Sequence, residues 1–222
     1  EGVELAKKIV EESEFGSRKV SGINKYAISL VAGGWSLFQL SLPKLLMLSA
    51  VYIRAIHLAF AISLVYLSYP AFKKVQTTGI FSFLSRKKGI SLIDWLLAVI
   101  AALAALYLAI DYVGLSGRQG AALPRDVWIG VILIILLLEA ARRSIGPALS
   151  IVALVFTLYS FFGPYMPDLI AFKGVSLGRY MGQITMSTEG ISGVPLDVSA
   201  TVVFLFVLFG AMLERAGGGQ YF

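Results

Sequence analysis

The sequence predicts an all-α integral membrane protein with about six transmembrane helices and an amphipathic interfacial helix. Hydrophobic residues make up 58% of the 222-residue chain and charged residues 14%, whereas about a quarter of the residues of a soluble domain are charged. The apolar residues are gathered in long runs rather than in a stripe with a period of 3.6 residues. These runs are too many and too continuous to be buried in one soluble core.

Six apolar runs approach the length of about 20 residues that a helix needs to cross a bilayer. The third run is the cleanest, whereas the fourth and sixth are short and need flanking residues or local thinning of the bilayer. Gly33 and Gly34 in the first run predict close approach of a neighbouring helix. The runs cover residues 26–42, 51–69, 92–110, 127–141, 145–162 and 198–213.

The boundary between the fourth and fifth runs leaves an alternative open. Only Arg142, Arg143 and a step from Gly146 to Pro147 separate the two runs, so residues 127–163 form either two spans or one long kinked helix. We expect two spans, because a pair of arginines in the middle of a membrane is energetically costly.

The distribution of Lys and Arg among the loops predicts the orientation. With the N-terminus in the cytoplasm, thirteen of these residues lie on the cytoplasmic side and six on the outer side, as expected because basic residues are enriched in cytoplasmic loops. The same enrichment accounts for the net charge of +6. Since no aromatic–basic module of the nucleic-acid-binding kind is present, we expect no nucleic-acid partner.

Residues 173–189 are predicted to form a short amphipathic helix at the outer membrane interface rather than a span. Leu177, Tyr180, Met181 and Ile184 fall at helical spacing, with polar residues elsewhere on the helical wheel. A Gly/Pro-rich segment, residues 190–195, follows this helix and precedes the sixth run.

Residues 188–219 have a distinctive sequence. Residues 188–219, TEGISGVPLDVSATVVFLFVLFGAMLERAGGG, join a Gly/Pro-rich turn to a Phe/Leu-rich run and a Leu-Glu-Arg-Ala-Gly exit. This stretch resembles the start of the large membrane subunit of tripartite ATP-independent periplasmic (TRAP) transporters, especially those that work with TAXI-type binding proteins. The matching positions are Gly193, Pro195, Leu196, Phe204, Phe206, Phe209, Gly210, Leu213, Glu214 and Gly217.

The first two runs extend the resemblance upstream. Residues 23–40, INKYAISLVAGGWSLFQL, resemble the family's first span, and residues 54–60, RAIHLAF, resemble the motif that opens its second span. The resemblance implies a fusion of two subunits: residues 1–22 form a cytoplasmic N-terminal segment, residues 23–143 a four-helix small-subunit-like scaffold region, and residues 144–222 the truncated start of a large-subunit-like transport region.

The resemblance also implies a function, a location and partners. The chain is expected to be a permease component of a secondary transporter in the bacterial or archaeal cytoplasmic (inner) membrane, a multi-pass symport system driven by an ion gradient. The expected partners are a periplasmic TAXI-type solute-binding protein, the remainder of the large membrane subunit and the lipid bilayer. No cofactor is expected, and the coupling ion, usually sodium or else a proton, is expected to bind outside these residues.

Two other functions remain open at this point. An accessory or assembly membrane protein would have no transport activity of its own, and an integral membrane enzyme of lipid metabolism would need clustered His, Asp and Glu residues. We expect no enzyme, because the chain has no Cys, a single His and none of the HExxH, CxxC, GxSxG, P-loop or dinucleotide-binding motifs.

Three polar residues of the spans, Arg54, His57 and Glu139, are candidate functional residues. Arg54 and His57 lie one turn apart on one helix face. They could form a proton relay or a docking point for the binding protein. We favour a third role, in which the pair holds the helix end near the headgroups. Glu139 precedes Arg142 and Arg143 at ion-pairing spacing, which favours structural anchoring over ion coupling. Asp94 is expected to be a cap or an interface residue.

A second group of candidates precedes the sixth run and comprises Gly190, Gly193, Pro195 and Asp197. Gly/Pro breaks at membrane depth often line transport sites. An ordinary loop, with Asp197 as the N-cap of the following helix, accounts for the same residues equally well.

Overall fold

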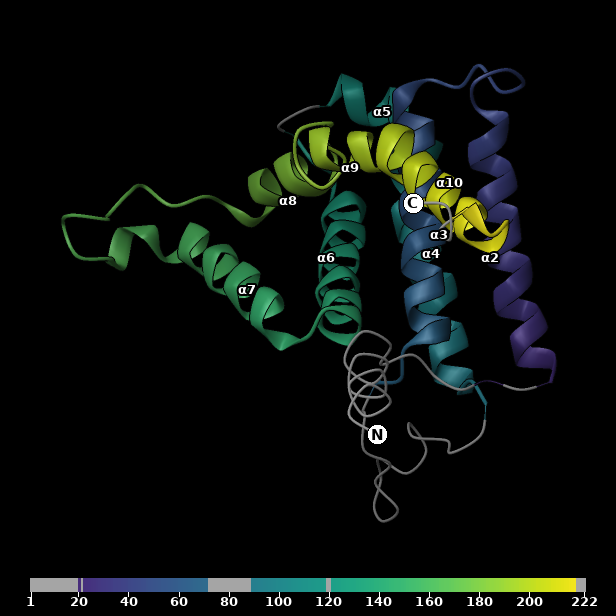
Figure 1. Ribbon diagram of the computed structural model, residues 1–222. Coiled ribbons are helices and arrows are strands. Elements are labelled where there is room, and N and C mark those ends of the chain that lie inside the picture. Colours follow the sequence, from purple (N-terminus) through teal and green to yellow (C-terminus); the bar gives the residue numbers. More distant parts are fainter. Residues whose placement is uncertain (1–19, 21, 72–88, 119–120, 219–222) are drawn as a thin grey trace, which may run out of the picture.

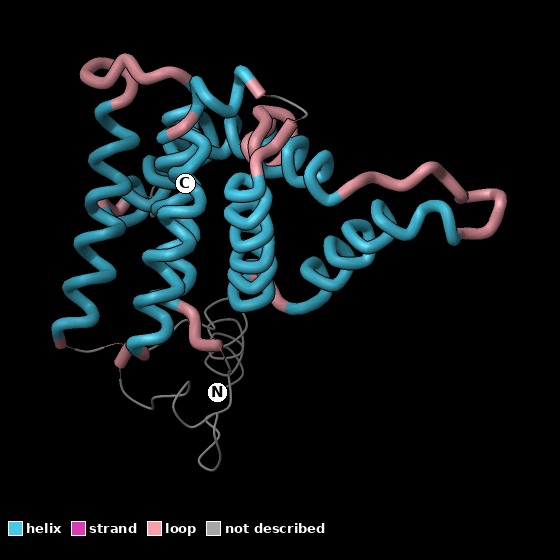
Figure 2. The backbone as a smooth tube through the Cα atoms, turned by 180° about the vertical axis from the view of Figure 1, so that it is seen from behind, coloured by secondary structure: helices cyan, strands magenta, loops and turns pink. Residues whose placement is uncertain are grey.

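The computed structural model describes residues 20, 22–71, 89–118 and 121–218, and this part of the chain contains helices and no strand (Figures 1 and 2). One of the helices, η3, is a π-helix and η2 is a short 3-10 helix. The helices are α2 (Ile23–Ser41), α3 (Ala50–Ser68), α4 (Leu92–Ile110), α5 (Tyr112–Gly117), α6 (Pro124–Ser144), α7 (Pro147–Phe162), η2 (Gly163–Tyr165), α8 (Leu177–Thr185), α9 (Val194–Val198), η3 (Ser199–Val203) and α10 (Phe204–Arg215).

Helices α2, α3, α4 and α6 form a bundle in which each helix runs opposite to the one before it (Figures 1 and 2). The most extensive contact is between α3 and α4, because α4 turns small side chains toward α3 and small residues let backbones approach closely. These buried residues are Ala98, Ala101, Ala104 and Ala105. The expectation for the glycines of α2 was wrong: a Cβ at Gly33 would meet no atom within 4 Å, and one at Gly34 would only touch Phe60 at 3.9 Å.

The bundle has two ends, which we name after the termini of α6. The Pro124 end holds the C-terminus of α2, the N-terminus of α3, the C-terminus of α4, and α5 (Figures 1 and 2). The Ser144 end holds the N-termini of α2 and α4 and the C-terminus of α3. The hydrophobic core runs between the two ends through α3, α4 and α6, with Tyr66 fully buried near the Ser144 end.

Residues 127–163 form two helices, as expected, rather than one kinked helix. The chain reverses at Gly146, which has a φ of 111° that favours glycine. Pro147 then begins α7, and proline fits the first turn of a helix because its missing N–H has no intrahelical partner there. Helix α7 diverges from α6 and has no buried residue (Figure 1).

The amphipathic helix that the sequence predicts at residues 173–189 corresponds to the shorter α8. Its Met181 and Thr185 are buried against α6, where Gly130 leaves room for them because a Cβ at that position would overlap Thr185 Oγ1. One side of α8 therefore packs on protein. Its position at a membrane interface stays a prediction.

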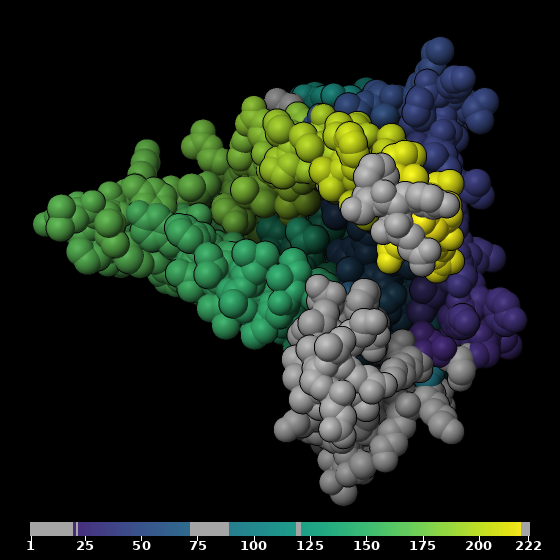
Figure 3. All heavy atoms as spheres, in the orientation of Figure 1, coloured from purple at the N-terminus to yellow at the C-terminus, as the bar shows by residue number. Residues whose placement is uncertain are grey.

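Helices α9, η3 and α10 form one continuous helical segment that lies across the bundle rather than along it (Figure 1). In the space-filling view this segment, coloured yellow, covers part of α3 (Figure 3), and it contacts α3 through α9 and η3 and α2 through α10. Most of its apolar side chains are exposed, including Phe206, Val207 and Phe209.

Four of the helical segments are long and apolar enough to cross a membrane. They are Ala50–Ser68, Leu92–Ile110, Pro147–Tyr165 and Val194–Arg215. The first and fourth predicted runs also form helices, of 19 and 21 residues, but they are not among the four. Polar residues explain this difference: α2 contains Asn24, Lys25 and Gln39, and α6 has charged residues at both ends. The six-span prediction is therefore supported for four helices.

Candidate functional site

An ion pair between Arg54 and Asp197 forms the centre of the candidate site. Arg54 Nε on α3 donates to Asp197 Oδ1 of α9 at 2.7 Å, and a second guanidinium nitrogen donates to the carbonyl oxygen of Ser192 at 2.9 Å. The planar fork of an arginine can serve two acceptors in this way. The side chains are 15% and 34% exposed, so the pair is accessible to solvent and is not locked in the core.

Asp197 reaches Arg54 because α9 begins earlier than the sequence predicted. Gly193 is the N-cap, the helix starts at Val194, and Pro195 lies in its first turn, where a proline is favoured. The alternative in which Asp197 is the N-cap is therefore wrong. Its backbone N–H instead donates to the Gly193 carbonyl oxygen at 3.1 Å, and its carboxylate is left to bind Arg54.

The turn before α9 needs its glycines for steric reasons. A Cβ at Gly190 would overlap backbone atoms of Ile184, and a Cβ at Gly193 would lie 2.7 Å from the Glu189 carbonyl oxygen. The turn is closed by a hydrogen bond from Ile191 N–H to the Ile184 carbonyl oxygen at 2.8 Å. This compact turn places the Ser192 carbonyl group where Arg54 can bind it.

His57 lies one turn after Arg54 and is surrounded by polar and aromatic side chains of three helices. Gln39 Nε2 lies 2.5 Å and Trp35 Nε1 3.3 Å from His57 Nδ1, both from α2. Ser199 Oγ of η3 lies 3.4 Å from His57 Nε2. The indole ring of Trp35 also packs against Phe204 of α10, with ring centroids 4.6 Å apart.

These contacts determine which nitrogen of His57 is protonated. An indole N–H can only donate a hydrogen bond, so Nδ1, which faces Trp35 Nε1, is the acceptor. In the neutral ring the proton is therefore on Nε2, which faces Ser199 Oγ. Gln39 is fully buried, and its Oε1 has no hydrogen-bond partner in the part of the chain that the structure describes.

The π-helix η3 begins at Ser199, the residue that faces His57. Single π-helical turns inside α-helices are uncommon and frequently occur at functional sites. The structure thus brings together six of the candidates that the sequence indicated: Arg54, His57, Gly190, Gly193, Pro195 and Asp197. We refer to them, with Trp35, Gln39, Ser192 and Ser199, as the junction.

Glu139, the seventh candidate, lies at the opposite end of the bundle. It forms the expected ion pairs, with Arg142 Nε at 2.7 Å and Arg143 Nε at 2.8 Å. Arg143 also pairs with Asp94 at 2.7 Å, and the side chains of both residues are only 2% exposed. The expectation that Asp94 is a cap or interface residue was wrong, because Ser91 caps α4 and Asp94 is needed to neutralise a buried arginine.

A third group of charged residues lies at the Pro124 end and was missed from the sequence. Arg118 pairs with Asp111 at 2.6 Å and with Asp126 at 3.2 Å. Burial alone would raise the pKa of the Asp126 carboxyl, but hydrogen bonds from Tyr107, Arg118 and the Leu123 N–H outweigh burial and hold this pKa below its ordinary value. These partners lie within 20 residues of Asp126 in the sequence. The short spacing between the charged residues could therefore have predicted this group.

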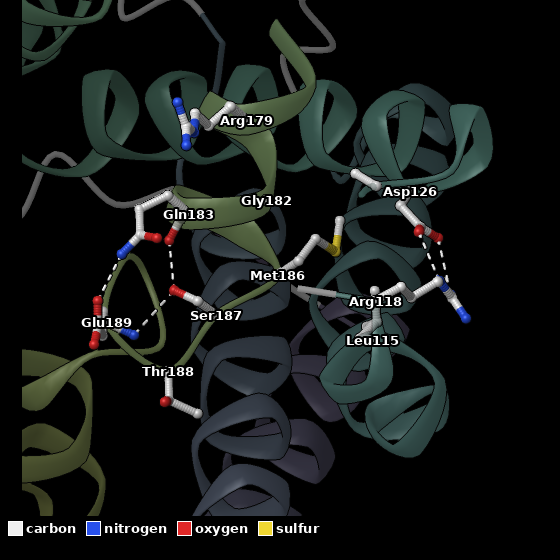
Figure 4. Close-up of a pocket in the computed structure, with 11 residues that line it drawn as sticks. Leu115, Arg118, Asp126, Arg179, Gly182, Gln183, Met186, Ser187, Thr188 and Glu189 are labelled. Atoms are coloured by element: carbon white, nitrogen blue, oxygen red, sulfur yellow. Dashed lines mark hydrogen bonds and ion pairs between the residues drawn. The ribbon is translucent and has the colours of Figure 1, made fainter. Parts of the chain in front are cut away.

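A pocket of about 310 Å³ lies beside this third group, between the start of α6 and α8 (Figure 4). Arg118 and Asp126 line one side, and Gln183, Ser187 and Glu189 line the other (Figure 4). Gln183 Nε2 donates to Glu189 Oε2 at 2.6 Å. Acidic and basic side chains both line the pocket and balance each other in charge. The pocket can therefore form hydrogen bonds with a ligand but has no strong net charge.

No protein-family model, curated protein or solved structure matches the chain. Within the described ranges, no three His, Asp or Glu side chains lie together as metal ligands. The junction is therefore the arrangement on which a functional proposal can be built, since it joins residues that are far apart in the sequence and contains a π-helix and a buried histidine.

Proposed function

We propose that the chain is a membrane permease component of a TRAP-type secondary transporter, in which an ion gradient drives the uptake of a solute that a separate TAXI-type binding protein delivers. Residues 23–143 act as the scaffold region, and residues 144–222 begin the transport region. The solute is carried by symport with sodium or with a proton, without ATP. Catalysis has no part in this proposal.

The observation that supports this proposal most directly is the ion pair of Arg54 with Asp197. It joins the scaffold-like region to the second apolar helical segment of the transport-like region, Val194–Arg215. Partly exposed ion pairs contribute little net stability, because solvent screens them and their side chains lose freedom. A contact of this kind can break and form again at small cost, as a junction between a fixed and a moving part requires.

The proposed topology has six spans and a cytoplasmic N-terminus. It adds α2 and α6 to the four apolar helices and places α8 at the outer interface. Two features support it: the helices of the bundle alternate in direction (Figure 1), and Lys25, Arg142 and Arg143 all lie at the Ser144 end, which would then face the cytoplasm.

Solute uptake into proteoliposomes tests the proposed function. The chain is reconstituted together with the remainder of the large subunit, and uptake is measured under an inward sodium gradient with the TAXI-type binding protein outside. We expect uptake that needs both the gradient and the binding protein and that does not need ATP. Liposomes with the 222-residue chain alone are the control and should show no uptake. ATP-dependent uptake, or none under any ion gradient, would contradict the proposal.

An accessory or assembly protein is the second candidate. The exposed apolar side chains of α7 and α10 favour it, because large exposed apolar surfaces of this kind mark contacts with lipid or with another membrane protein. The same reconstitution decides between the two. Unchanged uptake by the remaining subunits after removal of this chain would identify an accessory protein.

A further inference from the structure

We propose that His57 is a proton-binding site, and that proton uptake at its Nδ1 atom loosens the contact between α2 and the α9–α10 segment. The importance of this site for transport rests on the proposed function. The hydrogen-bond chemistry rests only on the junction.

Protonation of His57 reverses the hydrogen-bonding role of Nδ1. In the neutral ring with the proton on Nε2, the single lone pair of Nδ1 faces two N–H groups, Trp35 Nε1 and Gln39 Nε2. Addition of a proton makes Nδ1 a donor, so three N–H groups then point at one another. The proton comes from solution and forms one new N–H bond with the lone pair of Nδ1, no bond of the protein breaks, and the ring gains one positive charge.

Gln39 can accommodate the added proton without moving its backbone. Rotation of its amide group by a half turn exchanges Oε1 and Nε2. Oε1 has no partner to lose among the described residues, so after the rotation it accepts the new N–H of His57. The spare acceptor is thus beside the atom that gains the proton.

Trp35 has no such alternative, because an indole N–H is only a donor. It must turn away from the protonated ring. Since Trp35 packs against Phe204 at 4.6 Å and His57 against the same ring at 5.9 Å, this movement disturbs the contact that α10 makes with α2. Protonation therefore acts on the α9–α10 segment of the transport-like region.

Burial makes an imidazolium at His57 unfavourable while the junction is closed, since no anion among the neighbouring side chains that the structure describes is free to pair with it. Arg54 lies one turn away on α3, and its charge is balanced by Asp197 of α9. The facing side chains of α2, η3 and α10 are the neutral Trp35, Gln39, Ser199 and Phe204. By linkage, any movement that uncovers His57 favours proton uptake, and proton uptake favours that movement equally.

Nuclear magnetic resonance with ¹⁵N-labelled histidine and tryptophan tests this proposal directly, since His57 is the only histidine of the chain. The 222-residue chain in lipid nanodiscs is titrated from neutral to acid pH, and the indole N–H signals of the three tryptophans are followed. We expect the tautomer with the proton on Nε2 at neutral pH. On acidification the Trp35 signal should move together with that of His57, while the signals of Trp95 and Trp128 stay in place.

Substitutions of Gln39 sharpen the test. In Gln39→Glu a carboxylate faces Nδ1, so we expect the imidazolium fraction at pH 7 to rise by about tenfold or more and the Trp35 signal to adopt its acid position. The matched control is Gln183→Leu, because Gln183 binds Glu189 away from the junction, and it should titrate as the parent chain does. If Gln39→Glu does not fold, His57→Gln serves instead and should abolish the Trp35 transition.

Two results would overturn the proposal: the tautomer with the proton on Nδ1 at neutral pH, or a Trp35 signal that stays in place while His57 titrates. Neither measurement needs transport. The absence of uptake in proteoliposomes with a normal titration would count against the proposed function alone, and normal uptake with a failed titration would count against the proton site alone.

Discussion

Arg54 of α3 and Asp197 of α9 are 143 residues apart in the sequence and form an ion pair with 2.7 Å between Nε and Oδ1. The same guanidinium group binds the carbonyl oxygen of Ser192. One side chain thus fixes both the turn before α9 and the first turns of the helix that follows. Together with the packing of Ile191 and Leu196 on the core, these contacts hold the α9–α10 segment against α3.

Replacement of Arg54 should free this segment. In Arg54→Gln the Asp197 carboxylate loses its ionic partner, and we expect a destabilisation of only about 0.2–1 kcal/mol with faster hydrogen exchange at residues 194–203. Arg179→Gln is a matched control, since Arg179 is exposed and lies outside the junction. Equal exchange rates in both variants would show that the ion pair does not hold the segment in place.

Gly190→Ala should destabilise the turn before α9. The added Cβ would overlap backbone atoms of Ile184, and such overpacking costs about 1–3 kcal/mol. Gly210→Ala in α10 is the control, because no atom lies within 4 Å of a Cβ there and alanine favours a helix. Thermal unfolding in detergent should show a lower midpoint for the first variant only. A lower midpoint for both would mean that the turn has no special steric requirement.

Acid should weaken the Pro124 end of the bundle through Asp126. The pKa of this carboxyl is lower in the folded protein than its ordinary value, so it stabilises the fold above that ordinary value. This contribution is lost as the pH falls from about 4 through the lowered pKa. The loss of stability in acid should therefore be smaller in Asp126→Asn than in the parent chain. An equal loss of stability in acid for both proteins would show that groups other than Asp126 cause the acid sensitivity.

The six-span topology predicts the location of two loops that lie outside the described residues. A reporter fused after Gly79 should lie in the cytoplasm, and one fused after Gly120 should lie on the outer side, because α4 crosses the membrane between them. Reporters on the same side would mean that α4 does not span. Reporters in the reverse order would mean that the N-terminus lies outside.

The positions of the helices could be predicted from sequence because the apolar runs are bounded by proline, glycine and charged residues. The third run matches α4 at both ends. The pairing of Glu139 with Arg142 and Arg143 was also predictable, since it depends only on spacing within one helix. The helix ends and these ion pairs could be predicted because they depend on residues that are close together in the sequence.

The junction could be predicted only in part. Arg54, His57 and Asp197 stood out as polar residues near apolar runs, but their pairing depends on the direction in which α9–α10 leaves the turn, which no local pattern specifies. The alternative in which Asp197 is a cap overlooked the effect of Pro195 on the start of the helix. Gln39 was missed, although a buried amide in an apolar run is itself a signal of a polar contact.

A reversible cross-link across the junction tests the central claim most directly, namely that the contact between α3 and α9 must change during transport. The chain has no cysteine, so Ile53→Cys and Val198→Cys, next to Arg54 and Asp197, provide the only thiols of this chain and leave the ion pair intact. A flexible, reducible linker joins them in the reconstituted transporter. We predict that uptake stops on cross-linking, returns on reduction, and is unaffected by the reagent in either single variant. Full uptake with the cross-link complete would contradict the account.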